Sequence, residues 1–302
     1  MLWLPADLLS PPTVSLVSAQ AQRNIKVSEL TREDLVRASD LEDGRRKSRK
    51  KEGKNWRSCS DFQMARAAET AAMVALRNVV QRVQQASDRV NRPAAQVRVV
   101  AVSKTKPVSV IQEVYDSGHR HFGENYVQEL LEKAPQLPAD IQWHFVGHLQ
   151  SNKAKALVSG VPNLYMVESV DSLKVANHLD RAVSGLGRQP LRILVQVNTS
   201  GEKSKFGVEP SECVQLAKHV KKECPNLQFS GLMTIGMLDY TSTPENFQTL
   251  ASCREKVCRE LDIPEHECEL SMGMSSDFEN AIEMGSTNVR VGTTIFGPRE
   301  YT

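Results

Sequence analysis

The stretch VRVVAVSKTKP (Val97–Pro107) is a run of small and β-branched apolar residues that ends on two lysines and a proline. Its first part, Val97–Ser103, is too short for a helix and has the composition of a buried strand. Because proline fixes φ and lacks an amide proton, the chain is expected to leave the strand by Pro107. The sequence therefore predicts a buried strand that presents Lys104 at its carboxyl end, with Lys106 beside the turn.

Similar short runs follow at regular intervals, and segments of helical periodicity separate them. The predicted strands are Val97–Ser103, His121–Gly123, Gln142–Gly147, Leu164–Glu168, Ile193–Asn198, Ser230–Ile235, Glu269–Met272 and Val289–Gly292. The predicted helices are Val108–Ser117, Tyr126–Ala134, Ser151–Val158, Ser172–Val183, Pro210–Lys222, Pro244–Leu261 and Asp277–Glu283. Strand–helix alternation indicates a parallel sheet, and eight strands predict an α/β fold of the TIM-like (β/α)8 barrel type. The alternative, an open doubly wound sheet, needs a glycine fingerprint after the first strand that this sequence lacks.

The N-terminal part of the chain differs from the rest. Residues 1–63 lack hydrophobic periodicity, and the run Gly44–Lys54 is strongly basic. We interpret this run as a solvated tail; a localisation signal or phosphate-binding patch is the alternative. An alanine-rich helical pattern begins at Met64. We therefore expect a disordered or dispensable extension over residues 1–63, and a barrel domain over residues 64–302 with an added N-terminal helix.

Composition excludes several classes of protein. The whole chain has a formal net charge of +2, and residues 64–302 hold 26 basic and 27 acidic side chains, so no nucleic-acid partner is implied. No stretch approaches the roughly 20 apolar residues of a membrane span. The six cysteines lack CxxC spacing, which indicates reduced structural thiols and no metal site. We expect a cytoplasmic protein; a mitochondrial or plastid location is the alternative if residues 1–63 form a targeting segment.

The last predicted strand leads into a loop with the chemistry of an anion site, in NVRVGTTIFG (Asn288–Gly297). There Gly292 lets the backbone approach an anion, Thr293 supplies amide and hydroxyl donors, and Arg290 adds a positive charge. The preceding strand ends in SMGMSS, where Ser275 or Ser276 is expected to cap the helix Asp277–Glu283. Barrels often bind phosphate after their seventh and eighth strands. Together with Lys104, these loops suggest a Schiff base with a phosphorylated aldehyde.

Other strand ends also carry polar side chains that could face a ligand. These residues are Glu124, Asn125, His144, His148, Asn198 and Ser275. The carboxyl ends of barrel strands are where ligands collect, which favours a functional role for Lys104. The structural alternative is a rim lysine that extends into solvent.

Six motifs make the chain closely similar to a known family. They are AVSKTKP (Ala101–Pro107), FGENYVQEL (Phe122–Leu130), WHFVGHLQSNK (Trp143–Lys153), VNTSGEKSKFG (Val197–Gly207), GLMTIG (Gly231–Gly236) and LSMGMSSDFENAIEMGSTNVRVGTTIFGPREY (Leu270–Tyr301). In this order they resemble the pyridoxal phosphate homeostasis protein family, from about Met64 to the C-terminus. The resemblance implies a barrel like that of alanine racemase.

The same resemblance assigns the cofactor site. It implies pyridoxal 5′-phosphate held as an imine on the first lysine of SKTKP, Lys104, with Arg290 facing the pyridine nitrogen. Ser275, Gly292 and Thr293 are expected to hold the phosphate, and Asn125 to approach the ring. Because successive strand residues point to opposite faces, Lys104 and Thr105 cannot both face the barrel mouth.

The sequence is compatible with three functions. The resemblance implies a protein that buffers or delivers pyridoxal 5′-phosphate and so affects amino-acid and keto-acid balance. We expect this protein to be monomeric and non-catalytic, with apo forms of pyridoxal phosphate enzymes as recipients of the cofactor. The alternative is a racemase or lyase. In related racemases a second acid/base group comes from a C-terminal β-domain, and only ten residues follow Gly292 here. An arginine at the ring nitrogen also makes the cofactor a weaker electron sink. The candidate acid/base groups are His144, His148, Tyr126 and Lys205.

A protein that only binds partners would leave Lys104 and the Gly-Thr-Thr loop without a joint purpose.

Overall fold

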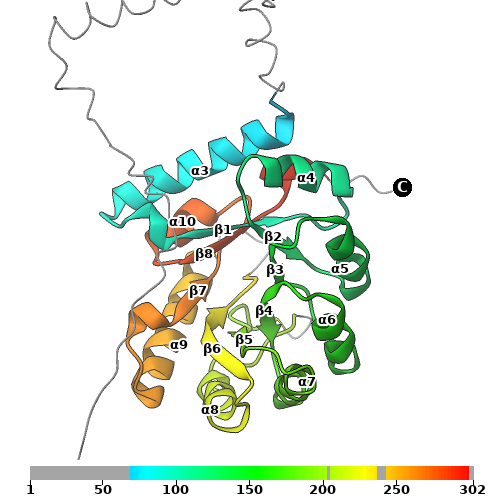
Figure 1. Ribbon diagram of the computed structural model, residues 1–302. Coiled ribbons are helices and arrows are strands. Elements are labelled where there is room, and N and C mark those ends of the chain that lie inside the picture. Colours follow the sequence, from blue (N-terminus) through cyan, green and yellow to red (C-terminus); the bar gives the residue numbers. More distant parts are fainter. Residues whose placement is uncertain (1–68, 203–204, 237–242, 299–302) are drawn as a thin grey trace, which may run out of the picture. The chain divides into compact units, whose positions relative to one another are not determined.

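The computed structural model describes residues 69–202, 205–236 and 243–298, which form a closed barrel of eight parallel strands surrounded by helices (Figure 1). The strands are β1 (Arg98–Val102), β2 (His121–Glu124), β3 (Gln142–Phe145), β4 (Leu164–Val170), β5 (Leu191–Gln196), β6 (Leu227–Met233), β7 (Glu269–Ser271) and β8 (Asn288–Val291). They follow one another around the barrel in chain order, and β8 pairs with β1 to close it. The predicted (β/α)8 fold is confirmed.

The helices lie outside the barrel and cover the outer face of the sheet (Figure 1). They are α3 (Ala71–Arg89), α4 (Val108–Asp116), α5 (Val127–Lys133), α6 (Ala154–Gly160), α7 (Leu173–Ser184), α8 (Cys213–Glu223), α9 (Thr243–Leu261), α10 (Phe278–Glu283) and α11 (Thr293–Phe296). Short 3-10 turns are η2 (Ala94–Gln96), η3 (Ala134–Gln136), η4 (Ser151–Lys153) and η6 (Glu265–Glu267). Within the described residues, no helix is both long and apolar enough to cross a membrane.

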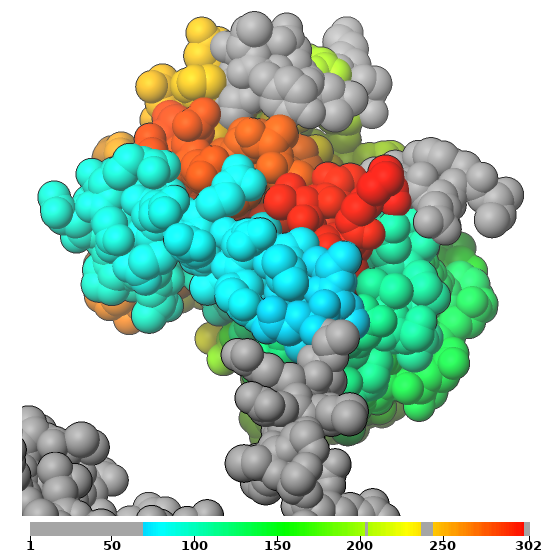
Figure 2. Space-filling model, turned by 90° about the horizontal axis from the view of Figure 1, so that it is seen from above, coloured from blue at the N-terminus to red at the C-terminus, as the bar shows by residue number. Residues whose placement is uncertain are grey.

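The N-terminal helix begins later than the alanine-rich sequence predicts. Met64 lies outside the described residues, but Glu69 and Thr70 are not helical, and α3 starts at Ala71. The Thr70 hydroxyl accepts a hydrogen bond from the Met73 amide at 3.4 Å, which caps the first turn. A bidentate contact from Arg82 to Glu279 joins α3 to α10. Figure 2 shows this blue-to-cyan helix beside the orange and red segments near the C-terminus.

The alternation of side chains along the strands separates two cores. On β1, Val99 and Ala101 belong to the large cluster between sheet and helices, whereas Val100 and Val102 form a separate cluster with Val146. The second set therefore faces the barrel interior. The interior also holds a run of buried polar side chains beneath the carboxyl ends of the strands: His144, Glu168, Ser271, Asn288 and Arg290. This polar interior directly underlies the candidate site.

Candidate functional site

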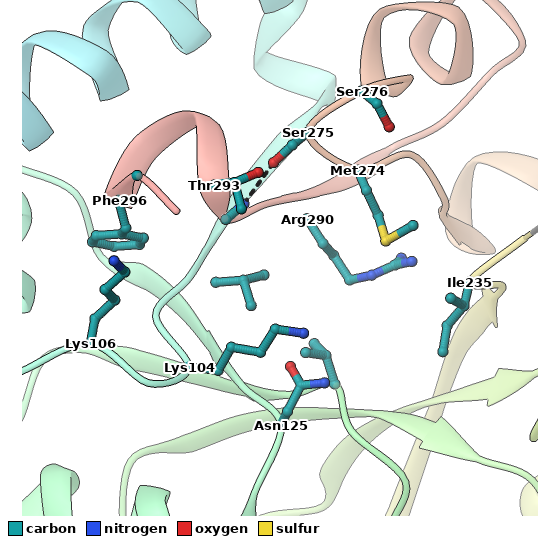
Figure 3. A pocket seen from close by; sticks show the side chains of 14 residues that line it. Lys104, Lys106, Asn125, Ile235, Met274, Ser275, Ser276, Arg290, Thr293 and Phe296 are labelled. Atoms are coloured by element: carbon teal, nitrogen blue, oxygen red, sulfur yellow. Dashed lines mark hydrogen bonds between the residues drawn. The ribbon is translucent and has the colours of Figure 1, made fainter. Parts of the chain in front are cut away.

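A cavity of about 310 Å³ opens at the carboxyl ends of the strands (Figure 3). All six residues that the sequence analysis assigned to a site line it: Lys104, Asn125, Ser275, Arg290, Gly292 and Thr293. They come from the ends of β1, β2, β7 and β8, which the closed barrel brings together. The lining also includes apolar residues that the sequence did not indicate, among them Ile235, Met274 and Phe296. These side chains give the cavity the mixed apolar and polar lining that is typical of a small-molecule site.

Lys104 lies on a turn and not on the strand itself. β1 ends at Val102, and the Lys106 amide donates to the Ser103 carbonyl at 3.1 Å. Thr105 has a φ of 61°, in the left-handed region that side chains other than glycine seldom adopt. The expectation that Lys104 and Thr105 alternate as strand residues is therefore wrong, because the chain has already turned at this point.

The two lysines of the turn separate in space. Figure 3 shows the Lys104 amino group at the centre of the cavity near Asn125, whereas Lys106 extends toward Phe296. The Lys106 Nζ donates to the carbonyl of Pro298 at 2.7 Å. Lys104 is thus the lysine whose amine faces the middle of the cavity.

A buried charged cluster holds the backbone on both sides of Lys104. The Lys133 Nζ donates to the Ser103 carbonyl at 2.9 Å, to Glu124 Oε1 at 2.7 Å and to Glu129 Oε1 at 2.6 Å. Glu124 Oε1 also accepts from the Ser103 hydroxyl at 2.7 Å, and Glu129 Oε1 accepts from the Thr105 amide. Burial raises the pKa of Glu124, and attraction to the Lys133 ammonium opposes this rise. This lysine–glutamate cluster stabilises the strained turn that carries Lys104.

Ser275 joins the two loops that the sequence analysis assigned to an anion. Its Oγ accepts from the amides of Gly292 at 3.2 Å and Thr294 at 3.4 Å (Figure 3). The expectation that Ser275 or Ser276 caps the following helix is wrong. Asp277 occupies the N-cap of α10, and its carboxylate accepts from the Met274 amide at 2.6 Å. The serine hydroxyl instead faces the amides at the end of β8.

Arg290 is deeply buried at the floor of the cavity, with 5% of its surface exposed. Its Nη2 donates to the Thr234 carbonyl at 2.7 Å, and its Nη1 donates to the Ser271 hydroxyl. Burial lowers the pKa of the guanidinium, while the charges of Glu168 and Asp277 act in the opposite direction. An arginine retains its proton in such surroundings, so the site contains a fixed positive charge.

The position of the Asn125 backbone requires a glycine at residue 147, which the sequence did not indicate. A Cβ atom at Gly147 would lie 1.9 Å from the Asn125 carbonyl oxygen, so only glycine permits the approach of these two loops. The Asn125 Oδ1 atom is buried and has no hydrogen-bond partner in the described part of the chain. The cavity wall therefore presents an acceptor that a ligand donor could satisfy.

Four of the polar residues expected at strand ends lie outside this cavity. Glu124 contacts Lys133, and the His144 Nδ1 lies 2.6 Å from Glu168 Oε1. His148 lines a neighbouring cleft with Tyr126, where its ring stacks on Phe206 at 3.6 Å. The fourth, Asn198, binds backbone, because its Nδ2 donates to the Glu202 carbonyl at 3.0 Å. The acid/base candidate Lys205 likewise donates to a backbone carbonyl, that of Gly236, at 2.7 Å. None of the acid/base candidates His144, His148, Tyr126 and Lys205 lines the cavity that contains Lys104.

The described cysteines and acidic clusters do not form a metal site. Across residues 69–202, 205–236 and 243–298, no three His, Cys, Asp or Glu side chains are grouped so that they could hold a metal ion. The five described cysteines are buried free thiols: Cys213, Cys224, Cys253, Cys258 and Cys268.

Two histidines at the opposite end of the barrel predict a loss of stability in acid. Burial and the charge of neighbouring His144 lower the pKa of His119 to about 4 and that of His121 to about 3. An unfolded histidine titrates near 6.5. As the pH falls below about 6.5, the unfolded chain therefore binds protons that the folded chain excludes, and the folded state loses stability until the folded-state pKa values are reached. We expect unfolding free energy to fall by roughly 1 kcal/mol per pH unit between pH 6.5 and 4.5.

Urea denaturation at successive pH values measures this loss. His119→Gln should flatten the dependence, whereas His266→Gln, at an exposed position of η6, should leave it unchanged. An equal slope in the wild type and His119→Gln would contradict the assignment.

Comparison with known proteins defines first the class and then the family. Residues 74–300 match the family model of the alanine racemase N-terminal domain. Alanine racemase from Corynebacterium glutamicum, at 12% identity and a TM-score of 0.57 over 77% of this chain and 62% of that chain, shares the fold. The chain is thus a barrel of the alanine racemase N-terminal type.

Relatives of higher sequence identity show which family within this class the chain belongs to. The pyridoxal phosphate homeostasis protein of Homo sapiens is 51% identical over 247 residues, which cover 78% of this chain and 90% of the relative. The protein of the same name from Schizosaccharomyces pombe is 48% identical over 206 residues, with 67% and 84% covered. The structure of PipY from Synechococcus elongatus with PLP bound is 36% identical and has a TM-score of 0.60, covering 72% of this chain and all of that chain. The chain belongs to the pyridoxal phosphate homeostasis protein family.

Proposed function

We propose that the chain binds pyridoxal 5′-phosphate through a Schiff base on Lys104 and buffers or delivers this cofactor in vitamin B6 homeostasis. One observation carries the proposal: the Lys104 amine, the fixed guanidinium of Arg290 and the hydroxyl-bearing Ser275 and Thr293 line one cavity. A relative of 36% identity over 72% of the chain has a structure with PLP bound, which supports the choice of ligand.

The residues of the cavity fit each part of this cofactor. The amides of Gly292 and Thr294 donate to Ser275 Oγ, which leaves the proton of the Ser275 hydroxyl as a donor for a phosphate, and Thr293 lines the same wall. Arg290 would hold the ring, and the unsatisfied Asn125 Oδ1 lies in the adjacent wall. When bound, the cofactor supplies an aldehyde whose carbon joins the Lys104 nitrogen as its oxygen leaves as water.

The surroundings of Lys104 favour exchange over turnover. The cavity contains a positively charged Arg290 in the place where a proton donor would strengthen the cofactor as an electron sink. Its lining includes none of the acid/base candidates named above. We therefore propose release to apo pyridoxal phosphate enzymes, from a monomeric protein of the cytoplasm in which residues 1–63 are dispensable.

The absorption spectrum of the purified protein with added pyridoxal 5′-phosphate tests this function. We expect a protein-bound chromophore that is lost when a cofactor-free pyridoxal phosphate enzyme is added and regains activity. Absence of any bound chromophore would refute cofactor binding. A steady loss of one amino-acid enantiomer that requires Lys104 would favour a racemase or lyase instead.

The close approach of β1 and β8 predicts a strong effect at Gly292. A Cβ atom there would lie 3.3 Å from the Val102 carbonyl oxygen, so we expect a branched side chain to push on the end of β1 and to shift the loop whose amides hold Ser275. We expect Gly292→Val to weaken pyridoxal 5′-phosphate binding by about tenfold, equivalent to 1.4 kcal/mol. Equilibrium dialysis measures the dissociation constant.

Gly185→Val is a matched control. The Cβ atom of this variant also lies 3.3 Å from a carbonyl oxygen, that of Arg181, but at the end of α7 and away from the cavity. Its dissociation constant should match the wild type. Equal affinity in both variants would remove Gly292 from the phosphate site.

A further inference from the structure

A chain of buried polar side chains runs from the floor of the cavity into the barrel interior. Arg290 contacts Ser271, and the Ser271 hydroxyl donates to Glu168 Oε2 at 2.6 Å. On the other side of the carboxylate, Glu168 Oε1 lies 2.6 Å from His144 Nδ1 and accepts from Asn288 Nδ2 at 3.0 Å. Glu168, Ser271, His144 and Asn288 are all fully buried. None of these four lines the cavity, so their effect on a ligand must pass through Arg290.

Glu168 is the fixed negative charge of this chain. Burial alone would raise the pKa of its carboxyl group, but the hydrogen bond and charge of His144, the charge of Arg290 and the Ser271 hydroxyl together lower it to about 2. The carboxylate thus stays ionised and keeps both oxygens as acceptors. His144 Nε2 in turn lies 3.0 Å from His121 Nδ1, which continues the chain toward the opposite end of the barrel.

The carboxylate determines how the Ser271 hydroxyl is directed. A hydroxyl has one proton, and here that proton is donated to Glu168, which leaves the oxygen lone pairs to accept from Arg290 Nη1. A glutamine in place of Glu168 has an oxygen on one side and an NH₂ group on the other. The NH₂ group would face either the Ser271 hydroxyl or His144 Nδ1, each of which donates to the carboxylate in the wild type, so two donors would face each other. If the hydroxyl then reversed, its proton would point at the guanidinium and the contact with Arg290 would be lost.

We propose that Glu168, acting through the hydroxyl of Ser271, is the positioning residue that holds Arg290 in place for the cofactor ring. The inference rests on the proposed function, because it assigns the ring to Arg290. In Figure 3 the guanidinium lies close to Met274 and points toward Ile235, away from the side chains of Ser275 and Thr293. The positioning should therefore affect the ring and spare the phosphate.

The test compares Glu168→Gln, Ser271→Ala and the double variant, with Glu269→Gln as control. Glu269 lies two residues before Ser271 on β7 and pairs with Arg98, and neither Glu269 nor Arg98 lines the cavity. Each single variant should raise the dissociation constant of pyridoxal 5′-phosphate by about five- to tenfold, the effect of one lost hydrogen bond to a charged group. Each should also displace the absorption maximum of the bound cofactor. Protection of the fold by inorganic phosphate alone should be unchanged.

Two comparisons distinguish positioning from general loss of stability. If Glu168 acts through Ser271, the double variant should bind the cofactor no more weakly than either single variant. The first change alone already breaks the Glu168–Ser271–Arg290 contacts, so the second has nothing further to remove. Additive effects would overturn the proposal, as would unchanged spectra and affinities in both single variants. Glu269→Gln should lower the melting temperature without altering the spectrum; an equal spectral change there would also overturn it.

A measurement on the cofactor-free protein separates this inference from the proposed function. In ¹⁵N NMR the Arg290 guanidinium of the wild type should show distinct, slowly rotating Nη groups, which average in Glu168→Gln and Ser271→Ala. Rapid rotation in the wild type would refute the positioning. A wild type that orders Arg290 yet binds no pyridoxal 5′-phosphate would refute the proposed function and leave the structural relay intact.

Discussion

Lys104→Ala is expected to abolish the absorbance of the covalently bound cofactor, and Lys106→Ala to retain it. The Lys104 amine lies at the centre of the cavity, whereas Lys106 donates to the Pro298 carbonyl at the edge. Only an amine that reaches the aldehyde carbon forms the covalent bond. Titration of each variant with pyridoxal 5′-phosphate, followed by absorption spectroscopy, measures the effect.

The phosphate contacts provide an internal control for this experiment. Lys104→Ala should still bind the cofactor non-covalently, because the Ser275 hydroxyl and the loop whose amides hold it in place are unchanged. Equilibrium dialysis should therefore detect residual binding in this variant. Full absorbance in Lys104→Ala, or its loss in Lys106→Ala alone, would move the site to the other lysine.

Lys133→Met should cause the largest loss of stability. The variant removes the ammonium that contacts Glu124 and Glu129 and leaves a fully buried carboxylate without its counter-charge. Breaking a buried ion pair from one side costs about 3–5 kcal/mol of unfolding free energy. Since the pKa of Glu124 is already raised by burial, the penalty should shrink as the pH falls and the carboxyl group takes up a proton. Urea denaturation at pH 7.5 and 5.5 measures both quantities.

Two further variants identify the cause of the lost stability in Lys133→Met. Lys133→Met combined with Glu124→Gln should recover much of the lost stability, because no uncompensated charge remains. Lys218→Met removes a lysine from an exposed pair with Glu260 and should cost less than about 1 kcal/mol. A similar small cost for Lys133→Met would show that the cluster does not stabilise the turn at Lys104.

The sequence allowed the barrel and the main site to be predicted because both depend on order along the chain. Apolar runs alternate with helical segments, and each run ends near an observed strand end, so Lys104 and Arg290 could be placed on the same edge. The parallel register then brings Gly292 beside Val102, which no local pattern indicates.

The buried polar contacts could not be predicted in the same way. Glu124 and Asn125 are neighbours at one strand end and look equally suited to a ligand, yet one contacts Lys133 and the other lines the cavity. Lys133 has the spacing of an ordinary helix lysine, and only the packing of α5 against β2 and the contact with Ser103 show that it is buried. Glu168 likewise appears as one acidic residue in an apolar run. Its partners Ser271 and His144 lie far away in sequence, so these contacts can be recognised only in the three-dimensional structure.

Borohydride reduction of the protein with bound pyridoxal 5′-phosphate tests the central claim most directly. Reduction converts the carbon–nitrogen double bond into a stable single bond, and tandem mass spectrometry of the peptides then locates the added mass. Our account predicts the label on Lys104, in the peptide that contains Val97–Pro107. Label mainly on Lys106 or on a lysine outside the cavity, or no label at all, would contradict it.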